Sequence, residues 1–189
     1  MSIAINVITT ANHTRCFTQQ NDDRINEIFR NLGSCTKLFA SRVLILGSAT
    51  ETEIFSPSSI TRIEIVTTRD LTEFLPKQLT MGKMTITSLP PDALDKTRQS
   101  RIDDENVSGR IDFFFEGGDT LPSWIEGIRP SDTSERLMNL TKLFEQPVLL
   151  YKLPQGGIGL MNPAVMTRAV IKSGAITLPS GAWQVEPVC

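Results

Sequence analysis

The pair of residues that comes nearest to a catalytic pattern lies close to the start of the chain. His13 is the only histidine, and Cys16 follows it closely. A thiol beside an imidazole can act as a nucleophile with its base, but this chemistry also needs an orienting group and an oxyanion site. A His-Cys pair without such partners is far more often a solvated loop histidine next to an ordinary cysteine. We therefore predict no catalytic residue.

Metal and cofactor binding have no clear source in the sequence. The histidine and the three cysteines (Cys16, Cys35 and Cys189) lack the Cys-x-x-Cys spacing of structural zinc sites. Two glycine-rich segments, 116–119 and 155–159, could hold an anion through backbone amides. Neither continues into the Lys-Ser/Thr of a phosphate-binding loop, and both are typical of hairpin turns. The sequence predicts no metal and no cofactor.

Carboxylates are densest between residues 103 and 119, where Asp112 and Glu116 are the most interesting pair. Residues two or four apart on one strand share a face, so these two side chains could act together in acid–base chemistry or ligand binding. Calcium-loop spacing is absent. The simpler interpretation is a solvated acidic turn, because clustered charges usually lie in water.

A Thr-Arg pair occurs twice, as Thr61-Arg62 and Thr167-Arg168. Arginine at matching positions could form an anion or carboxylate site through bidentate donation. Together with Asp112 and Glu116, Arg62 and Arg168 are the candidate ligand-binding residues. The alternative is that each arginine forms a salt bridge or packs its stem on a sheet, and this structural interpretation is favoured.

The Thr-Arg pair belongs to a longer internal match. Thr36-Lys37-Leu38-Phe39 recurs as Thr141-Lys142-Leu143-Phe144. At nearly the same spacing, with one inserted residue, the further matches are Val43-Leu44 with Val148-Leu149, Pro57 with Pro163, Thr61-Arg62 with Thr167-Arg168, and Ile65 with Ile171. An ordered run of identities with a single gap indicates an internal duplication.

Each predicted copy has the order β-β-α-β-β-β. In the first, 3–7 alternates like a strand, 14–18 is its hairpin partner, and apolar residues at 25, 28, 29 and 32 form one helical stripe that Gly33 ends in the left-handed conformation. In the second, strands are expected at 111–115 and 123–128 and a helix from Asp132 through about Asn139. Strands at 42–46 and 147–153, a short strand, a proline turn and a last strand at 60–66 or 166–171 complete the units.

The predicted architecture is therefore α+β, with two packed copies related by a pseudo-twofold axis. The first unit spans 1–66 and the second 110–189, with a closing strand at 176–185. The inter-repeat segment 67–109 is too apolar for a bare linker and is expected to be partly structured: a strand at 84–89, then a short helix from Pro91 through Ile102. A unit of this size buries little surface alone, so the copies are expected to share one core.

Composition limits the classes of function. The 19 basic and 21 acidic side chains give a net charge of −2, with no basic segment, so nucleic-acid binding has the least support. No stretch is long and apolar enough for a membrane span or a signal peptide, and unpaired cysteines suit a reducing compartment. We expect a cytoplasmic protein.

The scarcity of motifs makes a non-catalytic protein-binding or assembly module the leading hypothesis, with another protein as its partner. The alternative is a small-ligand receptor or enzyme whose site lies between the repeats. The oligomeric state stays open.

Overall fold

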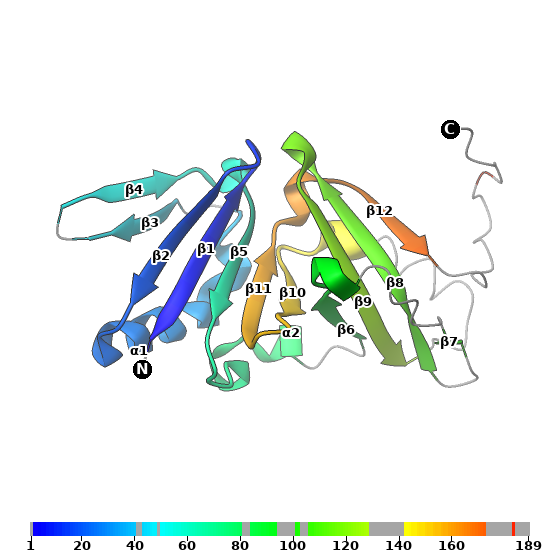
Figure 1. Ribbon diagram of the computed structural model, residues 1–189, viewed down its shortest axis with the longest axis horizontal. Helices are drawn as coiled ribbons and strands as arrows, with labels where there is room; N and C mark the ends of the chain where they lie inside the picture. The colour runs from blue at the N-terminus through cyan, green and yellow to red at the C-terminus, as the bar shows by residue number, and fades with distance from the viewer. Residues whose placement is uncertain are drawn as a thin grey trace.

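The fold is mixed α+β and consists mostly of one large sheet with few helices. The computed structural model describes residues 2–40, 43–48, 50–80, 84–93, 101–102, 106–128, 142–172 and 183. Ten strands form the large sheet in the order β12-β8-β9-β6-β10-β11-β5-β1-β2, with β7 paired to β8 beside this row (Figure 1). The predicted helix at 132–139 lies outside the described residues, and so does the closing strand at 176–185 apart from Trp183.

The strands alternate apolar and polar residues over most of their lengths. In chain order they are β1 (Ile3–Thr9), β2 (Thr14–Gln19), β3 (Leu44–Gly47), β4 (Thr52–Phe55), β5 (Ile60–Val66), β6 (Met84–Ser88), β7 (Arg101–Ile102), β8 (Asn106–Phe115), β9 (Thr120–Ile128), β10 (Leu149–Lys152), β11 (Gly157–Met161) and β12 (Met166–Lys172).

Helical segments are short apart from α1. They include α1 (Asp22–Asn31), η1 (Leu32–Lys37), η2 (Pro57–Ser59), η3 (Thr72–Phe74), α2 (Lys77–Thr80), η4 (Pro91–Ala93), η5 (Glu116–Gly118) and η6 (Pro163–Val165). No helix among the described residues has the length and apolar character needed to cross a membrane.

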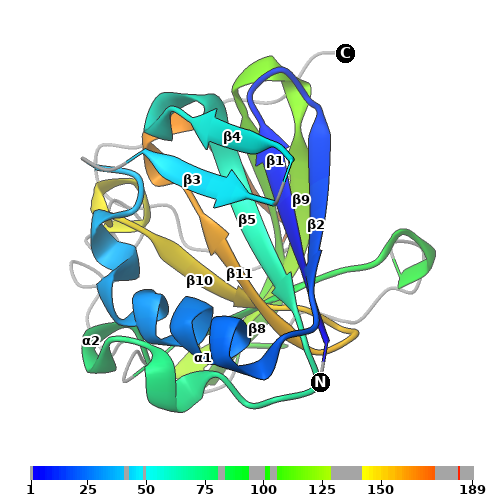
Figure 2. The same cartoon turned by 90° about the vertical axis from the view of Figure 1, so that its left-hand side faces the viewer.

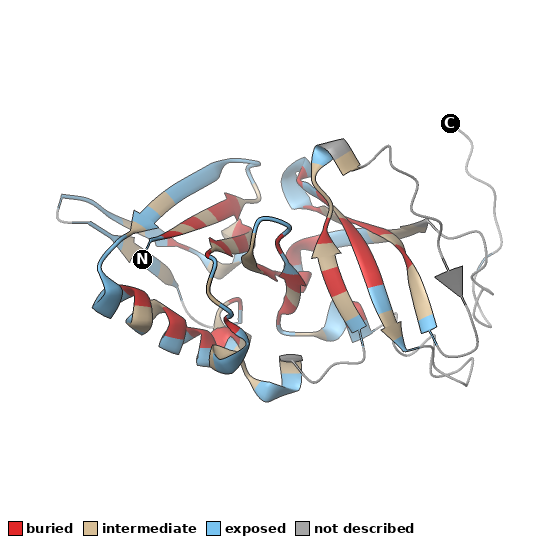
Figure 3. Ribbon diagram, turned by 60° about the horizontal axis from the view of Figure 1, so that its bottom comes forward, coloured by how far each residue is buried: buried red, intermediate tan, exposed pale blue. Residues whose placement is uncertain are grey.

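One end of the sheet is a three-stranded antiparallel group in which β1 pairs with β2 and with β5. Its inward side chains, among them Ile5, Ile63 and Ile65, form the first core with α1. The helix begins at Asn21, whose side chain accepts a hydrogen bond from the amide of Arg24, and its buried residues Ile25 and Phe29 lie one turn apart. Figure 3 shows this buried stripe turned toward the sheet.

The other end of the sheet is a second antiparallel group, in which β8 pairs with β9 and with β12. Ile111, Phe113 and Phe115 of β8 and Leu121 and Ile125 of β9 belong to the second core. β6 follows, antiparallel to β9 and parallel to β10. The predicted strand at 84–89 is thus confirmed, and it joins the sheet between strands of the second unit.

The hairpin β10–β11 joins the two ends because each of its faces belongs to a different core. Leu160 and the neighbouring Val148 lie in the first core, with Leu150 and Ile158 packed against it. Leu149, Tyr151 and Met161 lie in the second. β11 also pairs with β5, so the hairpin of the second predicted unit extends the sheet of the first. The described residues therefore form two cores, one on each side of this hairpin, instead of the single shared core that we expected.

The corresponding hairpin of the first predicted unit is placed differently. β3 and β4 form a two-stranded sheet of their own, and no other strand among the described residues pairs with it. Figure 1 shows this ribbon next to β2, at the opposite end of the molecule from β12, and Figure 2 shows it, like α1, in front of β5. A twofold axis would require β4 to pair with β12 as β11 pairs with β5. The expected pseudo-twofold packing is therefore wrong for the described strands.

Two further local predictions need correction. Gly33 does not have a positive φ, because the chain continues from α1 directly into η1. Of the helix expected from Pro91 through Ile102, the described residues show η4 at its start, and Arg101–Ile102 at its end form the strand β7 instead. Backbone pairing with β8 supplies hydrogen bonds that local helix preference does not anticipate.

Candidate functional site

Arg62 lies in a polar network where the two halves of the sheet meet. Its side chain is 14% exposed and forms ion pairs with Asp119, in the β8–β9 turn, and with Glu64, two residues along β5. Asp119 also lies 3.1 Å from the Thr61 hydroxyl, whose single proton it shares with the carbonyl of Ile8. The arginine is thus held by two carboxylates, one from each half of the chain.

Tyr151 connects the second half to the same network. Its hydroxyl donates a hydrogen bond of 3.0 Å to Oε1 of Glu64, and Nδ2 of Asn6 lies 3.5 Å from the other carboxylate oxygen. The tyrosine ring lies over Gly159, the residue that pairs with both Tyr151 and Glu64 on neighbouring strands. A side chain at Gly159 would occupy the place of the ring, so glycine is required there.

Burial and the neighbouring charges set the protonation states of Tyr151 and Arg62. Burial raises the pKa of Tyr151 well above its usual value, and the adjacent Glu64 carboxylate raises it further. For Arg62, burial works to lower the pKa, but Tyr151, Asp119 and Glu64 outweigh it and the pKa is raised. The tyrosine is therefore a neutral donor and the arginine a permanent cation.

Arg168, the counterpart of Arg62 in the sequence match, has a different setting. It is exposed, and its guanidinium carbon lies 4.1 Å from the centroid of the Phe114 ring, on the strand that pairs with its own. This is the geometry of a cation–π contact.

The two predicted carboxylates also differ from each other. Asp112 is buried and accepts two hydrogen bonds from Arg110, at 2.8 and 3.1 Å. It shares a face of the β8–β12 pair with Arg168. Glu116 is exposed in the turn η5. The four predicted ligand-binding residues thus occupy three separate settings: the buried network, the β8–β12 face and an exposed turn.

Sequence reasoning missed Asp119, Glu64 and Tyr151 as the partners of Arg62. Tyr151 is 87 positions from Glu64, and Asp119 is 57 from Arg62. No local pattern links residues so far apart. The one available signal was that Tyr151 is the only tyrosine and was predicted to lie on a strand.

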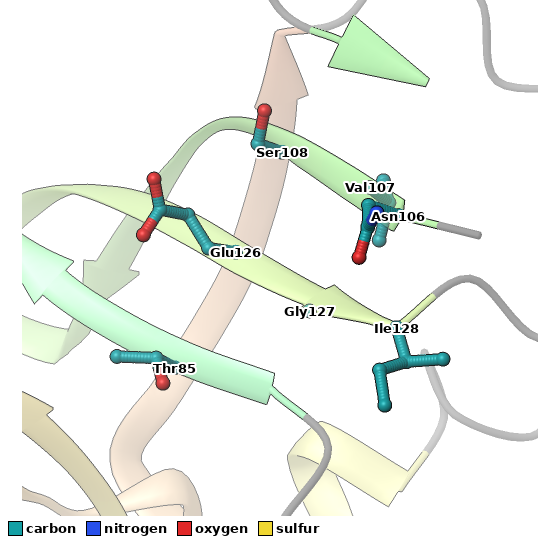
Figure 4. A pocket seen from close by; sticks show the side chains of 7 residues that line it. All are labelled: Thr85, Asn106, Val107, Ser108, Glu126, Gly127 and Ile128. Atoms are coloured by element: carbon teal, nitrogen blue, oxygen red, sulfur yellow. The ribbon is translucent and has the colours of Figure 1, made fainter. Parts of the chain in front are cut away.

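The remaining polar features do not gather into a site. His13 and Cys16 are both exposed, on the β1–β2 turn and on β2. An open hollow of about 400 Å³ lies over β6, β8 and β9, with Thr85, Ser108 and Glu126 on its wall (Figure 4). Glu126 accepts a hydrogen bond of 3.2 Å from the indole of Trp124. Among the described residues, no group of three or more histidine, cysteine or carboxylate side chains could hold a metal.

The β3–β4 ribbon carries a group of exposed apolar side chains. Val43, Ile45 and Ile54 are 53%, 57% and 66% exposed. Ile45 and Ile54 form a cross-strand pair, and Val43 lies on the same side of the chain two residues before Ile45. We call these three side chains the outer ribbon face. Contiguous exposed apolar side chains of this kind often mark an interaction surface.

The opposite face holds the ribbon in place. Phe55 and the half-buried Leu44 and Leu46 pack into the first core. The Phe55 ring meets Phe17 of β2 edge-on, with ring centroids 6.4 Å apart. Arg15 of β2 donates from Nε to both carboxylate oxygens of Glu53, at 3.1 and 2.9 Å. The ribbon is therefore anchored to the first core while its outer face is left to solvent.

Comparison with known proteins identifies no family. No protein-family model matches the chain, and neither a curated protein nor a solved structure does.

Proposed function

We propose that this protein is a non-catalytic protein-binding or assembly module made of two copies of one β-β-α-β-β-β unit, and that the outer ribbon face is its binding surface. The observation that carries the proposal is the exposure of Val43, Ile45 and Ile54 on a ribbon whose strand edges are unpaired among the described residues. Such edges with an apolar face form a ready template for another chain.

Strand pairing supports the duplication. The group β2-β1-β5 and the group β9-β8-β12 have the same order and the same antiparallel sense. In both groups the ladder shifts register at the threonine of the Thr-Arg pair. The hydroxyl of Thr61 donates to the carbonyl of Ile8 at 3.0 Å, and that of Thr167 to the carbonyl of Phe114 at 3.1 Å. Ile8 and Phe114 are the residues that pair with the following arginines.

The two hairpins also agree in register. Leu44 pairs with Phe55 as Leu149 pairs with Met161, and Ile45 pairs with Ile54 as Leu150 pairs with Leu160. The residue inserted in the sequence match then falls in the turn between β10 and β11. Turns tolerate insertions better than paired strands do. The sequence match and the pairing therefore support the same alignment of the two units.

The setting of Arg62 favours this function over a ligand site between the units. An anion-binding arginine needs donors free for its ligand, whereas Arg62 already bonds to Asp119 and Glu64 in a buried position. Those contacts hold the two halves together, which is a structural task. We therefore do not propose the receptor or enzyme alternative.

Affinity capture with matched baits tests the proposed function. The baits are the wild-type protein, the double variant Ile45→Lys/Ile54→Lys, and the control Ile128→Lys, which changes a side chain as exposed as Ile45 on a different strand. The proposal predicts a protein, of any identity, that the wild type and the control retain and the double variant loses. Equal capture by all three baits would refute the ribbon as the binding surface.

A further inference from the structure

The outer ribbon face has a buried counterpart in the same chain. In the alignment of the two units, Val43, Ile45 and Ile54 correspond to Val148, Leu150 and Leu160. The latter three pack into the first core, and Val148 and Leu160 are 0% and 1% exposed. One hairpin thus buries, against the neighbouring unit, the face that the other hairpin leaves in solvent.

The surface that receives the β10–β11 hairpin also has a counterpart. β11 pairs with the edge of β5, where Ile63 and Ile65 are each 3% exposed. The matching residues on β12 are Ala169 and Ile171, which pack against the second core but stay half-buried. Within the described part of the chain, β12 pairs only with β8, so its other edge has no strand beside it.

These two surfaces cannot meet within one molecule in this arrangement. The ribbon and β12 lie at opposite ends of the structure (Figure 1). The contact between the two units is head-to-tail, because β11 reaches β5 while β4 does not reach β12. A head-to-tail contact leaves one unused surface of each kind, and repetition between molecules gives a ring or an open chain.

We propose that the partner of the outer ribbon face is a second copy of this chain, in which β4 adds antiparallel to the edge of β12 that faces away from β8. This inference rests on the proposed function and names its partner. Val43, Ile45 and Ile54 then extend the second core of the neighbour as Val148, Leu150 and Leu160 extend the first core.

The β11–β5 pairing gives the register. Met161 pairs with Arg62 and Leu160 with Ile63, so Phe55 is expected opposite Arg168 and Ile54 opposite Ala169 of the neighbour. The amide of Asn162 donates to the carbonyl of Thr61 at 2.9 Å, which fixes the alternation of backbone groups along this edge. By that alternation, Ile63 bonds toward β11, and the amide of Ala169 points away from β8 to the opposite edge of β12.

Two variants block the two surfaces separately. Ile45→Lys/Ile54→Lys places charge on the outer ribbon face at exposed positions. Ala169→Pro removes the outward donor of β12 without removing a hydrogen bond to β8, since proline is tolerated at strand edges. Ile128→Lys is the matched control, and circular dichroism melting checks that each variant is folded.

Sedimentation equilibrium of the purified proteins over a wide range of concentration is the test. We expect the wild type and Ile128→Lys to associate and each blocking variant to be monomeric. An equimolar mixture of the two blocking variants should form one-to-one dimers and nothing larger, because one intact ribbon meets one intact edge. Recovery of the dimer also shows that both variants are folded.

A monomeric wild type, association that survives either blocking variant, or a mixture of folded variants that stays monomeric would each overturn the self-assembly proposal. If ribbon-dependent capture of a different protein persisted in that case, the proposed function would stand and only its partner would be wrong. If neither self-association nor ribbon-dependent capture of a different protein were observed, the proposed function would be wrong as well.

Discussion

The hydroxyl of Tyr151 on β10 donates a hydrogen bond of 3.0 Å to the carboxylate of Glu64 on β5, across the intervening strand β11. This bond joins β10 of the second half to β5 of the first. Arg62 makes a second connection between the halves, because it forms ion pairs with Glu64 and with Asp119 in the β8–β9 turn. Because Tyr151 is the only tyrosine, its state can be measured directly by spectroscopy.

The ionisation of Tyr151 should be delayed in the folded protein. Its pKa is raised well above 10 by burial and by Glu64. A titration of tyrosinate absorbance should therefore give no signal until well above pH 10 in the native state, and an ordinary transition near pH 10 in denaturant. A native transition near pH 10 would mean that the side chain is exposed.

The same shift makes stability depend on pH. The unfolded tyrosine loses its proton near pH 10 while the folded one keeps it, so the unfolded state binds fewer protons and stability falls as pH rises above 10. Tyr151→Phe should remove this dependence and cost about 1–3 kcal/mol at neutral pH by leaving the Glu64 carboxylate short of a donor. Urea denaturation at several pH values measures both effects.

The two arginines of the repeated Thr-Arg pair should respond differently to truncation. Arg62→Ala leaves Asp119 and Glu64 without their cation and should cost about 3–5 kcal/mol. Arg168→Ala removes an exposed cation–π contact with Phe114 and should cost about 1 kcal/mol or less. Chemical denaturation of both variants gives the comparison. Similar small costs would mean that Arg62 is free for a ligand, which would revive the receptor alternative.

Gly159 should be intolerant of a side chain. A Cβ atom there would lie 1.9 Å from the Tyr151 ring, so Gly159→Ala should destabilise the fold by about 1–3 kcal/mol or more. Gly33→Ala is the matched control, since its Cβ would lie 3.7 Å from the nearest atom without a positive φ, and it should be neutral or slightly stabilising. In a Tyr151→Ala background the cost of Gly159→Ala should shrink, because the clash is gone. If Gly159→Ala cost the same in both backgrounds, its destabilising effect would not come from a clash with the Tyr151 ring.

Local sequence patterns predicted the elements better than their arrangement. Alternation found β1 and β5, and the helical stripe that includes Ile25 and Phe29 found α1, because each pattern reflects one buried face. The insertion of β6 between β9 and β10 had no local signal, since strand order depends on contacts between distant segments.

For the candidate site, too, the sequence predicted single residues but not their arrangement in space. The match between Arg62 and Arg168 could be read from the sequence, but their different partners could not. Those partners depend on which strand lies beside each arginine. The exposure of Ile54 was equally hidden, because in the sequence it looks no different from the buried Leu160.

Amide hydrogen exchange at low and high protein concentration tests most directly whether the ribbon and the edge of β12 that faces away from β8 bind each other. The account predicts that 52–55 of β4 and 166–172 of β12 gain protection together as concentration rises, while β2, the strand at the other edge of the large sheet, is unchanged. Protection that stays constant at both segments, or that rises at β2 instead, would contradict it.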